Sequence, residues 1–231
     1  MARPIKKQQI PNLQEAIKET AWKLIAEFGA PALSLRAIAR ALSITAPAIY
    51  NYFPDRDALV TALTIDAFTS FGDFQLKARD TFPPDKTLER FHAIGLSYRS
   101  WALAYPQRYQ LIFGTPIPGY EKPQMKILPS AARSISALVS VIEDLLVADR
   151  LNIENFPAIP SGYAAQLSAM NIITDTCHSI SHGVSMIVWS RVHGLVSLEI
   201  GGHLPPFGVD GDALYHFELK SIVKQFIKES L

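Results

Sequence analysis

The sequence predicts an all-α protein, with a small N-terminal bundle of three helices followed by a larger C-terminal helical domain. Apolar residues recur three and four positions apart over most of the 231 residues, as on one face of a helix. No segment shows the strict alternation of an amphipathic strand. Short helices are expected over 1–53 and long ones after Pro54, so we divide the chain into domains 1–55 and 56–231.

Composition narrows the classes of protein. A hydrophobic content of 48 % with 19 % charged residues is typical of a folded globular chain. The apolar runs are shorter than the roughly 20 residues of a membrane span, and no apolar stretch follows the basic N-terminus as in a signal peptide. The single cysteine, Cys177, excludes an internal disulfide and a multi-cysteine metal site. We therefore expect a cytoplasmic protein with no membrane partner.

The three N-terminal helices have recognisable boundaries. Apolar residues form a continuous stripe over 13–28, and Gly29 is placed to end that helix. Ser34 is placed to cap a second, short helix. The apolar residues predicted to face inward from the second helix are Leu35, Ile38, Ala39 and Leu42.

The stretch "SITAPAIYNYF" (43–53) forms the third helix and has an unusual surface. After a turn at 43–44, Thr45 caps the helix and Pro47 stands in its first turn, where a missing N–H costs little. The segment carries no charge, and its small side chains and tyrosines are expected to face outward. Two short helices joined by a tight turn with such an outer face are typical of a helix-turn-helix that reads DNA.

The residue types fit a DNA major groove. Small side chains let a helix approach base edges closely, while Tyr50 and Asn51 can hydrogen-bond to bases or phosphates. Residues 1–60 hold eight basic and five acidic residues, which permits an anionic partner there. The basic side chains that could meet phosphates are Arg3, Lys6, Lys7, Arg36, Arg40 and Arg56. A plain hairpin of two helices is the alternative on pattern alone.

The segment "LSLRAIARALSITAPAIYNYFPDRDALVTAL" (33–63) resembles the DNA-binding segment of the TetR/AcrR family of transcriptional regulators. The match is long and unbroken in spacing, and it departs at the usual turn glycine, which is Ser43 here. If that position needs a positive φ, serine there costs on the order of 1 kcal/mol.

The resemblance implies roles for the matched residues. Arg36, Ala46, Pro47 and Tyr50 would face bases, and Thr45, Ala48, Tyr52 and Arg56 would meet phosphate. The full set that we expect to contact DNA is Ser34, Arg36, Thr45, Ala46, Pro47, Ala48, Tyr50, Asn51, Tyr52 and Arg56.

The remaining chain predicts long helices separated by proline and glycine. The segment 114–123 is rich in both and is expected to be a loop. The expected helices cover about 55–81, 85–105, 106–113, 129–151, 161–179, 182–199 and 211–231.

Two C-terminal segments extend the resemblance. "WSRVHGLVSLE" (189–199) is similar to the Trp-His-Gly signature of one C-terminal domain in this family, and 98–120 is similar to a second segment of that subgroup. We interpret Trp189 as a packed side chain and His193, one turn further on, as a hydrogen-bonded core histidine. A direct role in ligand binding is the alternative.

The resemblance also implies partners. A single helix-turn-helix reads few base pairs, so a homodimer on two half-sites about 34 Å apart is expected. The last two long helices, 184–204 and 212–231, carry more apolar residues than one core-facing stripe requires, and we expect dimerisation through them. The protein would be a regulator, most simply a repressor, that binds a palindromic double-stranded DNA operator and is released by a small-molecule effector.

An aromatic-rich set is the candidate effector pocket, since such pockets combine apolar walls with a few polar anchors. No cluster of Lys or Arg accompanies it, so a lipophilic effector is expected; an ordinary aromatic core is the alternative. The candidate ligand-binding residues are Phe68, Phe71, Phe91, Tyr98, Trp101, Tyr105, Tyr109, Phe113, His178 and Trp189.

The sequence gives little support to the hypotheses that the protein is an enzyme or binds a metal ion. Asp175, His178 and His182 share a helical spacing that could hold a divalent ion, but no fourth ligand is near in sequence. Cys177 and His178 are adjacent on a predicted helix, so their side chains point in different directions. They therefore cannot form the hydrogen bond by which a histidine activates a cysteine nucleophile. No motif for a nucleotide, a cofactor or a nucleophilic serine is present, so we expect no enzyme, cofactor or metal. A helical enzyme or small-molecule carrier that uses the C-terminal cavity is the competing hypothesis.

Overall fold

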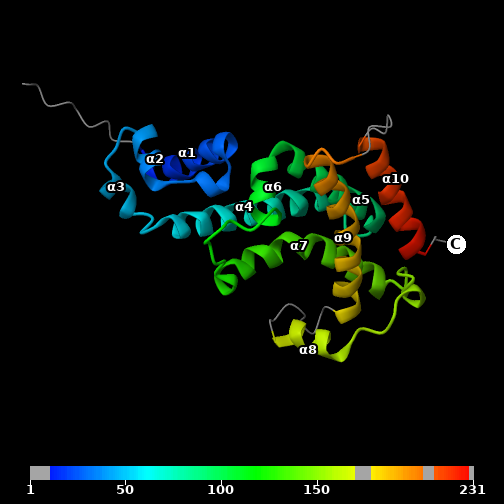
Figure 1. Ribbon diagram of the computed structural model, residues 1–231. Helices are drawn as coiled ribbons and strands as arrows, with labels where there is room; N and C mark the ends of the chain where they lie inside the picture. The colour runs from blue at the N-terminus through cyan, green and yellow to red at the C-terminus, as the bar shows by residue number, and fades with distance from the viewer. Residues whose placement is uncertain (1–10, 170–177, 205–210, 229–231) are drawn as a thin grey trace, which may run out of the picture. The chain divides into compact units, whose positions relative to one another are not determined.

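A computed structural model describes residues 11–169, 178–204 and 211–228 (Figure 1). The described residues form α-helices and short 3-10 helices, with no strand, which confirms the all-α prediction. Arg3, Lys6, Lys7, Asp175 and Cys177 lie outside the described residues. The helices are α1 Leu13–Phe28, η1 Ala30–Ala32, α2 Leu35–Ala41, α3 Ala46–Tyr50, α4 Arg56–Arg79, α5 Thr87–Ala104, α6 Pro106–Phe113, α7 Gln124–Val147, η2 Ile153–Asn155, α8 Ser161–Ala169, α9 Ser179–Ile200 and α10 Gly211–Phe226.

The chain forms two compact units that are not contiguous in sequence. One comprises Met1–Ala67 and Gln107–Ile127, and the other Phe68–Pro106 and Leu128–Leu231. Helix α4 begins in the first unit and ends in the second, while α6 belongs to the first from its second residue, Gln107, onward. The units therefore differ from a division at residue 55, which remains a proposal about function.

The N-terminal unit is built on one buried cluster. Ile17 of α1, Ile38 of α2 and Ile49 of α3 are fully buried in it, together with Leu59 and Leu63 of α4. The Lys18 ammonium bonds the Asp66 carboxylate at 2.8 Å and so ties α1 to α4. Because each short helix gives its apolar stripe to this one cluster, the cluster fixes the angle between α2 and α3.

Helix α6 and the following loop complete the same unit. The guanidinium of Arg108 lies 5.3 Å from the ring centre of Trp22, a cation–π contact between α6 and α1. The hydroxyls of Thr61 and Tyr120 are 2.9 Å apart and join α4 to the loop before α7. The aromatic and proline-rich segment 107–127 thus packs on α1 and α4.

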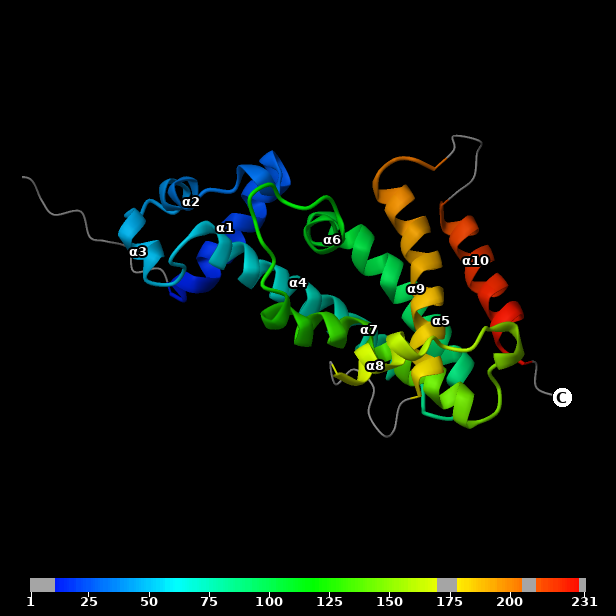
Figure 2. The ribbon, with the colours of Figure 1, turned by 60° about the horizontal axis from the view of Figure 1, so that its bottom comes forward.

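In the C-terminal unit, α9 and α10 run side by side and α5 packs against them (Figure 2). Gly95 lets α10 approach α5, because a side-chain carbon there would lie 2.7 Å from Leu219. The Tyr215 hydroxyl donates to the Gly95 carbonyl at 2.6 Å. The guanidinium of Arg99 bonds Glu199 at the end of α9 and Asp212 at the start of α10. These contacts fix the three helices together.

Several helix boundaries differ from the predicted ones. Helix α7 begins at Gln124 and contains Pro129 in its interior, whereas the sequence pattern predicted a start at Pro129. The Pro123 carbonyl accepts hydrogen bonds from the Lys126 and Ile127 amides, so Pro123 is the proline that precedes the helix. Helix α9 begins at Ser179 rather than 182. Of the helix predicted over 161–179, the structure describes 161–169 as α8.

The turn between α2 and α3 confirms the conformation suspected for Ser43. Its φ is +54°, and its amide donates to the Arg40 carbonyl while the Ile44 amide donates to the Ala39 carbonyl. This is a Schellman ending, in which the left-handed position is usually glycine.

We expect Ser43→Gly to raise the free energy of unfolding by about 0.5–1 kcal/mol, because it removes the left-handed penalty of a side chain. Urea titration measures the change. The control Ser100→Gly, in the interior of α5, is expected to lower stability by a similar amount. A destabilised Ser43→Gly variant would contradict the account of the turn.

Candidate functional site

The outer face of α3 is held in place by one buried side chain. Helix α3 has five residues, too few to be stable alone, and Ile49 anchors it by complete burial. Tyr50, the next residue, and Tyr52, just after the helix, are 46 % and 45 % exposed. Exposed Thr45, Pro47 and Asn51 complete the face, and Ala46 and Ala48 are half-buried. We call Thr45, Pro47, Tyr50, Asn51 and Tyr52 the α3 face.

The two N-cap residues of the motif keep their hydroxyls out of capping bonds. Ser34 precedes α2 and Thr45 precedes α3, and neither side chain makes a hydrogen bond to its own helix. Their hydroxyl groups can therefore serve an external acceptor such as phosphate.

Basic side chains flank the α3 face in two different ways. Arg36 and Arg40 of α2 are exposed, and neither forms an ion pair with another described residue. Arg56 instead holds the linker between α1 and α2, donating to the carbonyls of Leu33, Ala30 and Pro31 at 3.1–3.3 Å. The structure thus gives Arg56 a folding role, and its phosphate contact remains a proposal.

Three of the candidate ligand-binding aromatics line one small cavity. Phe91 and Tyr98 of α5 and Trp189 of α9 line a cavity of about 20 Å³ in the C-terminal unit. Phe71 lies beside this group, with its ring centre 5.0 Å from that of Tyr98 and 4.8 Å from that of Trp101. A space of this size holds about one water molecule.

The other aromatic candidates lie apart from this cavity. Phe68 is buried but does not line it, and Tyr105 is exposed. Tyr109 and Phe113 belong to the N-terminal unit, where their ring centres are 5.2 Å apart. Spacing along α5 and α6 did not reveal that a unit boundary falls between them.

Trp189 and His193 are both half-buried and pack on each other. Their rings stack with centres 4.9 Å apart. Nδ1 of His193 is 2.8 Å from the Tyr98 hydroxyl, and Nε2 is 3.3 Å from the Ser197 hydroxyl. Burial lowers the pKa of His193, so a neutral imidazole is favoured in this network.

Sequence reasoning missed most of the aliphatic wall of the cavity. Among the lining residues that were missed, Gln75 carries a polar side chain, which donates to the carbonyls of Ser134 and Phe71. A glutamine within an apolar stripe of a helix could have indicated a polar group in the core. The aliphatic lining residues look like any other core residues in the sequence. The missed lining residues are Gln75, Ile94, Gly95, Ile135, Leu138, Val188, Val192 and Leu219.

A larger apolar pocket, of about 470 Å³, lies at the first turns of α9. The segment 156–160 forms one wall, and Ile180, Val184 and Ile187 of α9 form another. Its polar group is the Tyr163 hydroxyl, 2.8 Å from Nδ1 of His182. Burial lowers the pKa of His182. We call this space the α9 pocket.

His178 and His182, whose spacing could have suited a metal ion, bond different side chains. His178 precedes α9 in extended conformation and bonds Glu143 through both its amide and Nδ1, whereas His182 bonds Tyr163. Across residues 11–169, 178–204 and 211–228, no three His, Cys, Asp or Glu side chains are grouped to hold a metal. Asp175 lies outside these ranges. Within them, no helix is long and apolar enough to cross a membrane.

Comparison with models of protein families distinguishes a plain hairpin of two helices from a DNA-binding helix-turn-helix. Residues 17–63 match the model described as bacterial regulatory proteins of the tetR family. Residues 91–222, more than half of the chain, match the model described as the tetracyclin repressor-like C-terminal domain. The chain belongs to the TetR family.

Individual TetR-family relatives agree. HTH-type transcriptional regulators of Mycobacterium tuberculosis and Mycobacterium bovis are 35 % identical over 131 residues, which is 57 % of this chain and 56 % of theirs. The chain thus matches little more than half the length of these curated relatives. The crystal structure of the regulatory protein SCO4313 has 32 % identity and a TM-score of 0.73, covering 93 % of this chain and 100 % of that one. These relatives are regulators rather than enzymes.

A TetR family transcription regulator from Marinobacter aquaeolei shares the fold, with 13 % identity, a TM-score of 0.63 and coverage of 94 % of this chain and 96 % of that one. At this identity the likeness concerns the fold alone.

The half-buried network around His193 predicts a pH dependence of stability. Because the folded state lowers the pKa of His193, the unfolded chain binds a proton first as the pH falls below about 6.5. Stability from this group is therefore complete above that pH and is lost below it. We expect His193→Gln to show a smaller drop in the free energy of unfolding between pH 7.5 and 5.5 than the wild type.

Urea titrations at the two pH values measure both drops. The exposed His203, changed to Gln, is the matched control and should leave the wild-type drop unchanged. An unaltered drop in His193→Gln would refute the neutral histidine.

Proposed function

We propose that the protein is a homodimeric, ligand-responsive DNA-binding regulator, a repressor that binds a palindromic operator and is released by a small lipophilic effector. The observation that carries this proposal is the α3 face: exposed, uncharged and held by Ile49 in a segment that matches the tetR-family model. Small residues permit close approach to base edges, and hydroxyl and amide groups provide hydrogen bonds there.

The roles divide between bases and phosphates. We assign base contacts to Arg36, Ala46, Pro47 and Tyr50, which stand on α2 and α3 around the exposed side. We assign phosphate contacts to a second set, with Arg40 supplying further positive charge. The phosphate set is Ser34, Thr45, Ala48, Asn51, Tyr52 and Arg56.

Dimerisation is proposed through α9 and α10. Ile187 and Leu198 are 42 % and 44 % exposed and lie eleven residues apart, with Gly194 between them on the same face of α9. Apart from its chain neighbours and its own helix backbone, no atom of the described residues lies within 4 Å of the position that a side-chain carbon on Gly194 would occupy. On α10, Phe217 is 69 % exposed. These apolar surfaces support a self-complementary interface between two copies.

The effector site is proposed at the α9 pocket, because its volume suits a small lipophilic molecule and the cavity beside Trp189 does not. The two spaces are neighbours along α9: Val184 lines the pocket and Val188, one turn on, lines the cavity. We propose that the Trp189 cavity is wider in one of two states of the protein. An effector in the α9 pocket that binds this state more tightly shifts the population towards it, by the ratio of its affinities for the two states.

The DNA-reading assignment is tested with Tyr50→Ala. We expect roughly a hundredfold loss of affinity for the DNA site that the wild type selects, because each of two copies loses a groove contact worth about 1–3 kcal/mol. Fluorescence anisotropy titration measures the affinity, and its plateau should correspond to two chains per duplex.

The control variant Phe82→Ala removes another exposed aromatic ring, far along the sequence from the helix-turn-helix, and should bind as the wild type does. Normal affinity in Tyr50→Ala would show that α3 is not the reading helix. A plateau at one chain per duplex would reject the dimer.

The effector assignment is tested by filling the pocket. Ala158 is exposed and lines the α9 pocket, so Ala158→Trp should occupy the space without overpacking the core. In a thermal-shift screen of apolar small molecules, hits that stabilise the wild type should lose their effect in this variant. Ala148→Trp, exposed outside the pocket, is the control. Hits retained in Ala158→Trp would place the effector elsewhere.

A further inference from the structure

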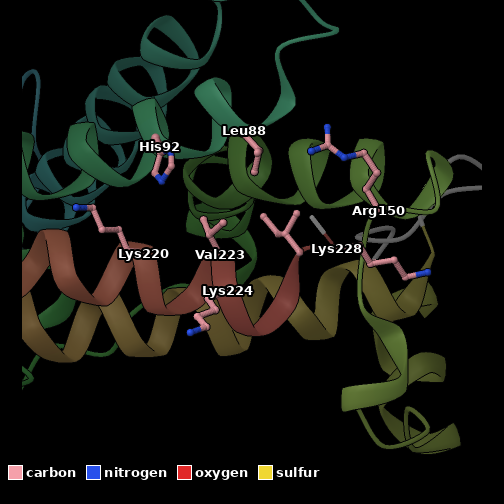
Figure 3. Close-up of a pocket in the computed structure, with 8 residues that line it drawn as sticks. Leu88, His92, Arg150, Lys220, Val223, Lys224 and Lys228 are labelled. Atoms are coloured by element: carbon pink, nitrogen blue, oxygen red, sulfur yellow. The ribbon is translucent and has the colours of Figure 1, made fainter. Parts of the chain in front are cut away.

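A third space in the C-terminal unit differs in chemistry from the cavity beside Trp189 and from the α9 pocket. It has a volume of about 430 Å³ and lies between α5, α10 and the residues that follow α7 (Figure 3). Its floor is aliphatic. We call it the α5–α10 groove. The lining residues are Leu88, His92, Arg150, Lys220, Val223, Lys224, Ile227 and Lys228.

The groove is strongly cationic. Four of its eight lining residues are Arg or Lys, and no carboxylate lines it. Lys220 and Lys224 are one turn apart on α10, and no ion pair joins either of them to a residue of the described part of the chain. The ion pair that reaches the lining set joins Lys228 to Asp149 at 2.8 Å. Like charges at this spacing repel one another, so an anion placed between them is favoured.

Arg150 adds a more specific observation. Its Nε is buried and has no hydrogen-bond acceptor among the described residues. Figure 3 shows its guanidinium extending towards Leu88 on the α5 side of the groove. A buried donor without an acceptor is costly, and a guanidinium pairs best with a carboxylate or phosphate. This geometry indicates where an anionic head group would be placed.

The opposite end of the groove has a different character. His92 and Lys220 lie there, and the Lys220 ammonium extends towards the α5 side in Figure 3. Burial lowers the pKa of His92; Glu89 opposes this, and His216 and Lys220 add to it. Val223 lies between the two ends, and the lining holds no Phe, Tyr or Trp ring, so the His92 imidazole is the one ring in it that could stack on a nucleobase. An aliphatic chain therefore suits the floor better than a nucleotide does.

We propose that the α5–α10 groove is a second ligand site, which binds a small anionic amphiphile: an acyl chain that ends in a carboxylate or a phosphate. The head group pairs with Arg150, and the chain lies along Leu88, Val223 and Ile227. Lys220 and Lys224 supply a positive rim that attracts the anion. This site is distinct from the α9 pocket, which shares no lining residue with it.

Isothermal titration of the full chain tests the proposal with four probes, each below its micelle concentration. Octanoate and octyl phosphate distinguish the two possible head groups, octyl glucoside lacks the charge, and inorganic phosphate lacks the chain. We expect one or both anionic amphiphiles to bind at least about tenfold more tightly than the other two probes. Equal binding of octyl glucoside, tight binding of inorganic phosphate alone, or no binding of either amphiphile would overturn it.

Variants locate the site. Arg150→Met keeps an unbranched apolar stem but removes the charge and the donors, and should weaken the preferred amphiphile at least about tenfold. The double variant Lys220→Met/Lys224→Met changes two exposed positions and should weaken binding and flatten its salt dependence. Lys77→Met, exposed on α4, is the charge-matched control and should bind as the wild type does.

Circular dichroism and melting temperature confirm that each variant folds. Affinity that is unchanged in both groove variants contradicts the proposal. So does affinity that is retained in Arg150→Met but lost in Ala158→Trp, since the amphiphile would then occupy the α9 pocket.

Discussion

The burial of Ile49 is the constraint on which the reading surface depends. Helix α3 is too short to persist by its own hydrogen bonds, so its conformation comes from one aliphatic side chain inserted into the cluster that Ile17 and Ile38 share. Ala46 adds a partial contact with the same cluster, and Pro47 and Tyr50 of α3 remain exposed. Small residues and tyrosines can then face outward without loss of stability. The left-handed Ser43 sets the direction in which α3 leaves α2, and the Arg56 clamp holds the linker that precedes α2.

Features determined locally could be predicted from the sequence, and those determined by packing could not. The turn at 43–44, Pro47 in the first turn of α3 and the end of α1 at Gly29 follow from the conformational limits of single residues. The place of α6 in the N-terminal unit depends on Trp22, eighty-six residues before Arg108, and no periodicity encodes that contact. For the same reason Tyr109 and Phe113 were grouped with a cavity they do not line, and Gln75 was overlooked.

The C-terminal unit has an apolar pocket beside α9 and a cationic groove beside α10. The first turns of α9 border an apolar pocket whose polar group is the Tyr163 hydroxyl, paired with a histidine for which burial favours the neutral form. Further along α9, Tyr98 satisfies His193 in the same manner. The groove beside α10 instead gathers lysines and an arginine over an aliphatic floor. The α9 pocket thus suits an apolar ligand, and the α5–α10 groove suits an anionic one. Both spaces are bordered by helices that pack against α5.

Selection of bound fragments from a pool of random duplex DNA, with the purified full chain at two salt concentrations, tests the central claim most directly. Specific reading by paired α3 faces predicts a two-fold symmetric motif, with half-sites about one helical turn apart, that is still enriched at the higher salt. Binding without a motif that disappears at the higher salt would mean that the basic side chains hold phosphate alone, and it would contradict the account of α3 as a base-reading helix.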